Sequence, residues 1–377
     1  MRRSRPLVGI DARKLKDFGI GAYIWNLLEA LGRRPESLAY RFRVFGHAAD
    51  RDSLPPLPPH FDLVLEEAPG YSLSELTGFA WRLLRHGLDL FHATHYVLPP
   101  LPRGRAIVTI HDIIHLLYPQ FLPSRAAHLY ARVMIRRALS RADRIITVSH
   151  NSKRDLTDYF GVASDRVEVI YNGVARRFRA DVPEDERRRV AGKLGLPSPY
   201  VLFLGGERPH KNVRNVVRAF AEARRREAFH HALVLAGPLP KNRGRVEALI
   251  AALDLDKAVR RTGLVDDADL PGLYAGATAF LYPTLYEGFG LPVVEAMACG
   301  VPVLTSATSA LQEVAGGHAL LVDPMDVDAI AAGIVTLATD AKKRAELARL
   351  GLTRAADFSW DKAAEATLNV YAAVLRS

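Results

Sequence analysis

Cysteine is almost absent from this sequence of 377 residues, which contains only Cys299. One cysteine can form neither an internal disulfide nor a cysteine-rich zinc site, and this usage is typical of a reducing compartment. The sequence also lacks an apolar run of about 18 residues, which a membrane-spanning helix needs. A strand-like segment, LVGID, follows the basic N-terminus where a secretory signal would have a long apolar region. We therefore expect a folded cytoplasmic protein.

Acidic residues are scarce in the first half of the chain only. Residues 1–180 contain 27 Lys and Arg against 17 Asp and Glu, whereas residues 181–377 contain 24 of each. The net charge of +10 therefore comes from the first half. A solvated surface, an anionic membrane or acceptor, and nucleic acid can each explain such an excess. Because aromatic and basic residues are poorly interleaved, no nucleic-acid partner is expected.

Strand-like apolar runs alternate with helical stretches along most of the chain. The runs are continuous, which is typical of parallel strands covered on both faces. The expected strands are 7–11, 40–46, 61–66, 88–93, 106–112, 143–149, 167–170, 200–206, 231–237, 279–284, 301–306 and 319–324. The main expected helices are 20–32, 124–141, 150–160, 212–226, 242–254 and 358–375. This pattern predicts an α/β protein with two doubly wound, Rossmann-like domains.

The alternation stops between residues 176 and 199 and then restarts, which indicates two domains. We expect an N-terminal domain over 1–180, a linker over 181–198 and a C-terminal domain over 199–357. A final helix over 358–377 is expected to pack back toward the N-terminal domain. The two domains should face each other across a cleft, with ligands at the carboxyl ends of the strands.

The segment YPTLYEGFGLPVVEAMACGVPVLTS (282–306) carries the strongest functional signal. Glu287 lies on a loop directly after an expected strand, and Glu295 is expected in the first turn of the following helix. Gly288 and Gly290 let the backbone approach a ligand beside a helix N-terminus, which favours anions. A carboxylate accepts two hydrogen bonds from a vicinal diol, so sugar hydroxyls suit both glutamates. Singly, each could be an ordinary surface acid; together they indicate a binding site.

The block EGFGLPVVEAMACGVPV resembles the signature of retaining, nucleotide-sugar-dependent glycosyltransferases of family 4 (glycosyl transferases group 1), which have the two-domain GT-B fold. That family carries two glutamates separated by seven residues, as Glu287 and Glu295 are here. The segments IDARKLKDFGIGAYIWNLLEAL, TIHDIIHL, VSHNSKRDL, VIYNGV, GGERPHKN, LVDP and FSW also follow the family's order. The chain looks most like bacterial mannosyltransferases of surface-polysaccharide assembly.

This resemblance implies transfer of a hexose from a nucleotide diphosphate sugar to a hydroxyl of a glycan or lipid-linked acceptor. Mannose and glucose are the favoured sugars, and GDP-mannose is the first candidate donor. The N-terminal domain would bind the acceptor and the C-terminal domain the nucleotide sugar. No metal or other cofactor would be required. A nucleotide-sugar epimerase or a phosphorylase on the same fold stays open as an alternative, with a nucleic-acid-binding protein less favoured.

The resemblance also implies roles for the residues of the EGFGLP segment. Glu295 matches the glutamate that binds the ribose hydroxyls of the donor. Glu287 matches the glutamate that contacts hydroxyls of the donor sugar. The backbone groups of Phe289, Gly290 and Leu291 would hold the sugar and the phosphates.

The segment GGERPHKN combines a strand end with two cationic residues. In the family, a lysine matching Lys211 and an arginine stabilise the departing diphosphate, which positioned cations can do without a metal. Many members place that arginine where this chain has Gly205, and others where it has His210. We expect Arg208 to replace it, with solvated basic residues as the alternative. Gly206 is expected among the donor-binding residues.

Two segments of the first half complete the expected site. FGIGAY lacks the third glycine of a dinucleotide fingerprint. The family interpretation is a glycine loop near the donor diphosphate and the acceptor, with Gly19 and Gly21 permitting close approach. His111 matches a histidine of the family's active centre, and Asp112 would hold its ring or cap the next turn. Three further histidines lie nearby without the helical spacing of a zinc site: His92, His95 and His115.

The expected helix 124–141 contains arginines but no acidic residue. Each basic residue near an anionic leaflet contributes about 1 kcal/mol of attraction. We therefore expect peripheral docking at the inner face of the membrane, with an ordinary solvated face as the alternative. Val133 and Met134 are expected to pack away from this basic face. The arginines are Arg125, Arg132, Arg136, Arg137 and Arg141.

Overall fold

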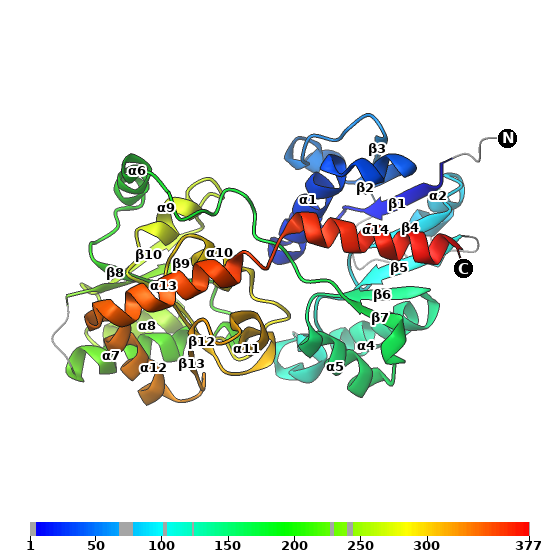
Figure 1. Cartoon of the computed structure of the whole chain (residues 1–377). Coiled ribbons are helices and arrows are strands. Elements are labelled where there is room, and N and C mark those ends of the chain that lie inside the picture. Colours follow the sequence, from blue (N-terminus) through cyan, green and yellow to red (C-terminus); the bar gives the residue numbers. More distant parts are fainter. Residues whose placement is uncertain are drawn as a thin grey trace. The chain divides into compact units, whose positions relative to one another are not determined.

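The computed structural model describes residues 5–67, 78–100, 104–122, 124–226, 230–239 and 244–376. The chain forms two compact units, which we describe separately (Figure 1). Unit 1 comprises Met1–Gly173 and Ser359–Ser377, and unit 2 comprises Val174–Phe358. The first boundary therefore precedes the expected residue 180.

The segment expected as a linker, 181–198, belongs to unit 2. It contains helix α6 (Glu184–Leu194), which packs on helix α9 (Leu270–Ala275). Val190 of α6 is fully buried and lies so close to Gly272 that a Cβ on the glycine would be 2.7 Å from a Val190 methyl group. This packing makes the segment part of a folded domain.

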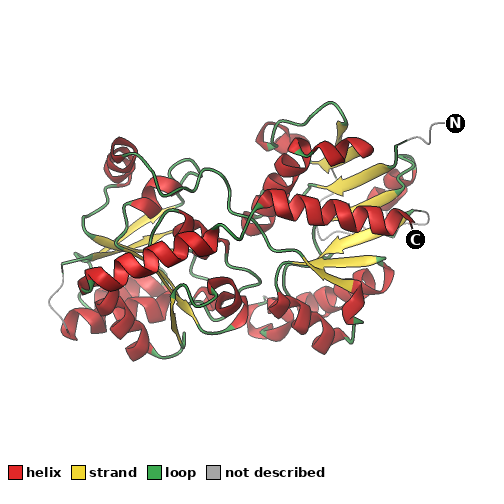
Figure 2. Ribbon diagram, in the orientation of Figure 1, coloured by secondary structure: helices red, strands yellow, loops and turns green. Residues whose placement is uncertain are grey.

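Unit 1 is built on a parallel sheet with the strand order β3-β2-β1-β4-β5-β6-β7 (Figure 2). Its strands are β1 (Leu7–Asp11), β2 (Arg41–Gly46), β3 (Phe61–Leu65), β4 (Leu90–Ala93), β5 (Arg105–Thr109), β6 (Arg144–Thr147) and β7 (Val167–Val169). Ile10 of β1 lies in register with Val44 on one side and with His92 on the other. The direction of strand addition reverses beside β1, so the loops after β1 and β4 diverge and can hold a ligand.

The α-helices of unit 1 cover both faces of this sheet, because crossovers in opposite directions place helices on opposite faces. They are α1 (Phe18–Arg33), α2 (Ala80–Leu84), α3 (Ile114–Leu117), α4 (Arg125–Arg141), α5 (His150–Phe160) and α14 (Trp360–Arg376). The last helix, α14, packs on α1. Leu83 of α2, Ile135 of α4 and Leu156 of α5 share one hydrophobic core.

Unit 2 repeats the design with the strand order β10-β9-β8-β11-β12-β13, again with parallel pairs. Its strands are β8 (Tyr200–Leu204), β9 (Ala232–Ala236), β10 (Val259–Gly263), β11 (Ala279–Tyr282), β12 (Val303–Ser306) and β13 (Leu320–Val322). Besides α6 and α9, its α-helices are α7 (Val213–Arg226), α8 (Arg245–Ala252), α10 (Leu291–Ala298), α11 (Ser309–Ala315), α12 (Val327–Thr339) and α13 (Ala341–Ala355). The order reverses between β8 and β11, so the loops after these strands flank the equivalent position.

The two sheets confirm the predicted α/β class with doubly wound domains. Of the six predicted helices, α5 has the expected bounds and α4 and α7 begin one residue later. The larger differences are in α1, which begins at Phe18, in α8, which covers only Arg245–Ala252, and in α14, which covers Trp360–Arg376. The first two residues of the expected helix 242–254 lie outside the described residues. Within the described ranges, no helix combines the length and the apolarity that a bilayer crossing requires.

Candidate functional site

The reversal point of unit 2 brings together the two segments that the sequence singles out. One is the loop after β8, which contains the short 3-10 helix η6 (Pro209–Lys211), and the other is the loop after β11. The N–H of Leu285 donates to the carbonyl of His210 at 2.8 Å. The side-chain amide of Asn212 donates to the carbonyl of Pro283, also at 2.8 Å. Hydrogen bonds therefore join the two loops into one continuous surface.

Lys211 and Glu287 are direct partners on this surface. The Lys211 Nζ lies 2.8 Å from Glu287 Oε1 and 2.8 Å from the hydroxyl of Tyr282. The Tyr282 hydroxyl donates to the same Glu287 oxygen at 3.1 Å. The side chains of Lys211 and Glu287 are 22% and 14% exposed, so both remain reachable by a ligand. The chain thus holds a cation and a carboxylate side by side at the reversal point.

The charge on Lys211 is maintained by its partners. Burial works against the ammonium form, but the Glu287 carboxylate and Tyr282 outweigh it and raise the Lys211 pKa above its ordinary value. Burial raises the pKa of Tyr282, so its phenol stays neutral and can donate to Glu287. A fixed ammonium group beside a fixed carboxylate can hold a diphosphate on one side and hydroxyl groups on the other.

Helix α10 begins directly after Gly290, which has a left-handed conformation with φ of 98°. A Cβ at Gly290 would lie 2.4 Å from a methyl group of Leu311, so both conformation and space require glycine. No side chain caps this helix end. Pro292 has no N–H, and the N–H of Val293 donates to the Gly290 carbonyl at 2.9 Å. The helix dipole nevertheless makes the end that begins at Leu291 favourable for an anionic or hydroxyl-bearing ligand.

Glu295 is not in the first turn of α10, as the sequence interpretation expected. The helix starts at Leu291, so Glu295 is its fifth residue. The hydroxyl of Tyr274 donates to Glu295 Oε2 at 3.0 Å. Burial raises the pKa of Glu295 to about 7, opposed by Tyr274 and by the charge of Arg177. At neutral pH this carboxyl group is therefore only partly charged, and its charged form can accept hydrogen bonds from ligand hydroxyls.

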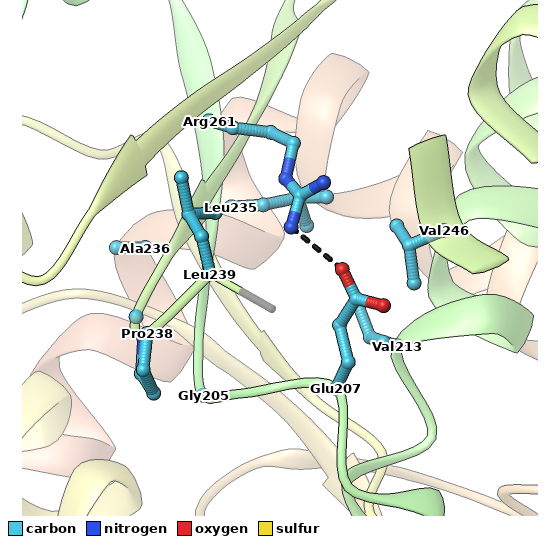
Figure 3. Close-up of a pocket in the computed structure, with 10 residues that line it drawn as sticks. Gly205, Glu207, Val213, Leu235, Ala236, Pro238, Leu239, Val246 and Arg261 are labelled. Carbon is cyan, nitrogen blue, oxygen red and sulfur yellow. Dashed lines mark hydrogen bonds and ion pairs between the residues drawn. The ribbon is translucent and has the colours of Figure 1, made fainter. Parts of the chain in front are cut away.

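The loop that leads to Lys211 packs tightly against the end of β9. The N–H of Gly205 donates to the carbonyl of Ala236 at 2.8 Å. A Cβ at Gly206 would lie 3.2 Å from the ring of Pro238. Arg208 is exposed, and its guanidinium makes no ion pair with any residue in the described parts of the chain. A small pocket lies behind this loop, with Glu207 and Arg261 paired across it (Figure 3).

In unit 1, the two predicted glycines lie in the first turn of α1 rather than in a preceding loop. The helix starts earlier than expected because the N–H of Gly21 already bonds to the carbonyl of Asp17 at 2.7 Å. A Cβ at Gly21 would lie 2.0 Å from the Leu15 carbonyl oxygen, so this glycine is required by packing. Gly19 is exposed, with open space around it, and only this glycine offers the backbone to a ligand.

His111 lies just after β5, next to the loops of the unit 1 reversal point. Its Nε2 donates to the carbonyl of Thr94 at 3.0 Å, and the hydroxyl of Ser152 donates to the His111 carbonyl at 3.0 Å. The Tyr23 ring meets the His111 ring edge-on, with centroids 4.8 Å apart. Burial lowers the His111 pKa to about 4, so the ring is neutral at physiological pH. Asp112 caps the next turn by accepting from the N–H of Ile114 at 3.0 Å.

His92 belongs to a buried hydrogen-bond network of unit 1. Its ring nitrogens bond to the hydroxyls of Tyr371 at 2.7 Å and of Thr109 at 2.8 Å. The Tyr23 hydroxyl is 3.1 Å from the same Thr109 oxygen. Burial lowers the His92 pKa to about 3, as expected for a neutral core histidine. Across the described residues, no three His, Cys, Asp or Glu side chains are arranged to hold a metal ion.

Helix α4 presents arginines together with apolar side chains. Arg125, Arg132, Arg136 and Arg141 are exposed, whereas Arg137 is partly buried. Met134 is buried as expected. Val133, however, does not pack into the core: it is 48% exposed, and Leu129 beside it is 60% exposed, because the core side of α4 is already filled by Ile135 and Ala138. The outer face of α4 is therefore both basic and apolar.

The structure brings Lys211 and Glu287 into contact and places Arg208 three residues from Lys211 on the same loop. Phe289, Gly290 and Leu291 lie between the two glutamates. Sequence reasoning missed Tyr282 and Tyr274, the hydroxyl partners of these glutamates. Their only signal was that each is a tyrosine in an apolar segment, where the buried hydroxyl must find a partner.

Two protein families match the sequence. The family "Glycosyl transferases group 1" matches residues 185–352, and "Glycosyltransferase Family 4" matches residues 19–177. O-antigen chain mannosyltransferase B from Escherichia coli is 31% identical over 370 residues, which cover 94% of this chain and 95% of that protein. These matches support the resemblance inferred from the sequence, including bacterial mannosyltransferases as similar proteins.

Solved structures confirm the fold. A sucrose-phosphate synthase from Thermosynechococcus elongatus superposes with a TM-score of 0.79 at 22% identity and covers 99% of this chain and all of its own. HepE from Anabaena, crystallised with UDP and glucose, has a TM-score of 0.78 at 19% identity, with 98% and 100% of the two chains covered. The predicted GT-B fold is thus confirmed.

Proposed function

The chain belongs to the family 4, group 1 glycosyltransferases, and from this premise we propose that it transfers mannose from GDP-mannose with retention of anomeric configuration. The general activity, without the identity of the sugar, is transfer of a hexose from a nucleotide-sugar donor to a glycan acceptor. The choice of mannose rests on the name of the similar Escherichia coli mannosyltransferase. The main structural support for the proposed donor site is the Lys211–Glu287 pair, which lies where the strand order of unit 2 reverses.

We propose that the donor binds along the loops after β8 and β11. Lys211 and Arg208 hold the diphosphate, because one is a maintained ammonium group and the other is an exposed guanidinium on the same loop. Glu287 accepts hydrogen bonds from hydroxyls of the donor sugar. Glu295 accepts them from the ribose hydroxyls. The backbone around Gly206 and from Phe289 to Leu291 completes the phosphate and sugar contacts.

In the proposed reaction, the bond between the anomeric carbon and the phosphate oxygen breaks while the acceptor oxygen bonds to the same face of the sugar. The acceptor proton passes to the departing phosphate oxygen, so no separate protein base is needed. Lys211 and Arg208 stabilise the negative charge that develops on the diphosphate. His111, neutral and oriented by Thr94, belongs to unit 1 and is proposed to contact the donor sugar, with the exposed Gly19 beside the diphosphate. The proposed reaction uses no metal.

A transfer assay with purified variants tests these roles. Glu287→Gln and Lys211→Ala should each lower the transfer rate by about 100-fold, the usual cost of losing one stabilising contact in a transition state. Lys343→Ala removes a partly exposed lysine of α13 that pairs with Glu346 and serves as the matched control. Near-wild-type turnover of either site variant would refute the assignment. Nuclear magnetic resonance of the product then reports whether the anomeric configuration is retained.

A thermal-shift panel identifies the donor. GDP, UDP, ADP and their sugar derivatives are compared, since a ligand that binds only the folded state raises the unfolding temperature. We expect the largest shift with GDP and GDP-mannose. A larger shift with UDP or UDP-glucose would overturn the choice of donor while leaving the glycosyl transfer intact.

We further propose that the outer face of α4 docks on the inner surface of an anionic membrane, where a lipid-linked acceptor resides. Arg125, Arg132 and Arg136 are exposed on this helix, and Leu129 and Val133 lie among them. Basic side chains attract anionic headgroups, and neighbouring apolar side chains gain from burial at the interface. This places a basic surface on unit 1, the proposed acceptor-binding unit.

A further inference from the structure

An ion pair between Glu207 and Arg261 anchors the loop after β8, which contains Arg208. Neither residue of this pair belongs to the proposed donor site. Arg261 Nη2 lies 2.6 Å from Glu207 Oε1, with the two side chains only 14% and 18% exposed. Glu207 comes from the loop after β8, whereas Arg261 comes from the edge strand β10. The pair joins two segments that are 54 residues apart in the sequence.

Apolar side chains surround this pair and keep it in one place. Figure 3 shows Glu207 and Arg261 extending toward each other across a small pocket, with Leu235, Val213 and Val246 around them. An ion pair among such neighbours is screened less by water than a surface pair. Arg261 makes a second, longer contact of 3.3 Å with the more exposed Glu247 of α8.

The position of this pair determines where Arg208 projects. Arg208 directly follows Glu207 and has an extended backbone, with φ of −62° and ψ of 139°. This conformation is close to polyproline II, in which successive side chains are rotated by about 120°. Anchoring Glu207 on the side of α7 and α8 therefore turns Arg208 away from that side, where it is exposed.

The pair also neutralises a carboxylate next to a proposed anion site. A free Glu207 would repel the donor diphosphate, and it could pair with Arg208 and compete for its guanidinium. Arg261 prevents both effects by holding the carboxylate on the opposite side of the loop. A lysine at 261 would keep the charge but lose the planar geometry that grips a carboxylate.

We propose that Glu207 and Arg261 form a positioning pair that presents Arg208 to the diphosphate of the donor. This inference rests on the proposed function, because it assumes that Arg208 binds the diphosphate. Glu207 and Arg261 themselves contact neither the donor nor the acceptor. They act through the loop and through the charge that they cancel.

Calorimetric titration of GDP and of UDP into the full-length variants tests the positioning pair. Arg261→Met should weaken binding of the nucleotide diphosphate about tenfold, equivalent to about 1.4 kcal/mol. Adding Glu207→Gln to that variant should restore only the part of the affinity that the free carboxylate removed, because the loop still lacks its anchor. Arg261→Lys should give an intermediate affinity. Glu247→Gln, which removes only the outer contact, should bind as the wild type does.

The outcomes separate this inference from the proposed function. Thermal unfolding of each variant is measured in parallel, so that affinity is compared only among folded proteins. Wild-type affinity in Arg261→Met, or wild-type affinity in the double variant, would overturn the positioning pair. Arg208→Ala is titrated alongside: if its affinity is unchanged, the proposed role of Arg208 fails, whereas a loss there with none in Arg261→Met refutes only the positioning pair.

Discussion

The Lys211 ammonium group has two anionic partners to satisfy. It pairs with Glu287 in the structure, and it is proposed to bind the donor diphosphate in the reaction. Tyr282 eases this conflict because its hydroxyl donates to the same Glu287 oxygen that Lys211 contacts. When the ammonium group shifts toward a ligand, Glu287 keeps one hydrogen bond and is not left unpaired. In the proposed complex, Tyr282 would therefore keep Glu287 hydrogen-bonded while Lys211 binds the diphosphate.

From its proposed role, we expect Glu295 to make the affinity for nucleotide dependent on pH. Burial raises its pKa from 4.5 to about 7, so the charged form, which is the better acceptor for ribose hydroxyls, grows as the pH rises through 7. We expect nucleotide diphosphate to bind more tightly at about pH 8 than at about pH 6, and we expect Glu295→Gln to lose this difference. Isothermal calorimetry at both values measures it, with the glutamine variant correcting for titration of the ligand's own phosphate.

The same shift has a defined effect on stability. The folded pKa lies above the unfolded one, so the folded protein binds more protons between about pH 4.5 and pH 7 and loses stability as the pH rises through this window. Relative to the wild type, Glu295→Gln should therefore gain in unfolding temperature as the pH rises. An equal difference between the two proteins at all pH values would contradict the raised pKa.

The site residues differ in how far their roles could be predicted from the sequence. Glu287 and Lys211 lie in glycine-bearing segments at strand ends, and this pattern predicted a site. Their direct contact depends on strands β8 and β11 being neighbours, which the order of segments along the chain does not encode. Tyr282 and Tyr274 look like ordinary core residues until the fold points their hydroxyls at carboxylates.

Among the elements, β10 was missed because of its position in the sheet. Its sequence, VRRTG, has one apolar residue, whereas the central β8 reads YVLFL and is almost wholly buried. An edge strand has a neighbour on one side only and can carry charged residues. The continuous apolar runs that predicted the other strands therefore do not occur there. Arg261 of the positioning pair lies on this strand, so the inference from it required the structure.

Helix α14 is tied to strands of unit 1 by the His92 network. Tyr371 on this helix and His92 on β4 are 279 residues apart in the sequence, yet they share a buried hydrogen bond. Thr109, at the end of β5, joins the same network two residues before His111. The last helix of the chain therefore supports the strand end that positions the proposed active-centre histidine.

Removing one hydroxyl tests this support. Tyr371→Phe leaves a ring nitrogen of His92 without its partner in the core, which should lower the free energy of unfolding by about 1–3 kcal/mol. Tyr40→Phe is the matched control, because the Tyr40 ring packs against Tyr371 but its hydroxyl bonds to no residue in the described parts of the chain. Urea unfolding of both variants measures the difference, and equal losses would show that the network contributes no more than packing.

At the scale of the whole molecule, charge is divided unevenly between the two halves of the chain. Residues 1–180 carry the entire excess of 10 positive charges, and residues 181–377 are balanced. The unbalanced half includes α4, whose outer face combines arginines with Leu129 and Val133. Diffuse charge alone would give weak attraction to any polyanion, whereas we expect a face that is both basic and apolar to favour a lipid surface.

Vesicle flotation distinguishes docking through α4 from a general effect of charge. The protein should float with vesicles of phosphatidylcholine and phosphatidylglycerol but not with phosphatidylcholine alone. The double variant Arg132→Ala/Arg136→Ala should lose about 2 kcal/mol of binding, roughly thirtyfold in partitioning. Arg214→Ala/Arg218→Ala removes two exposed arginines with the same spacing on α7 of unit 2 and should float as the wild type does. Equal losses in both variants, or flotation that ignores anionic lipid, would contradict docking through α4.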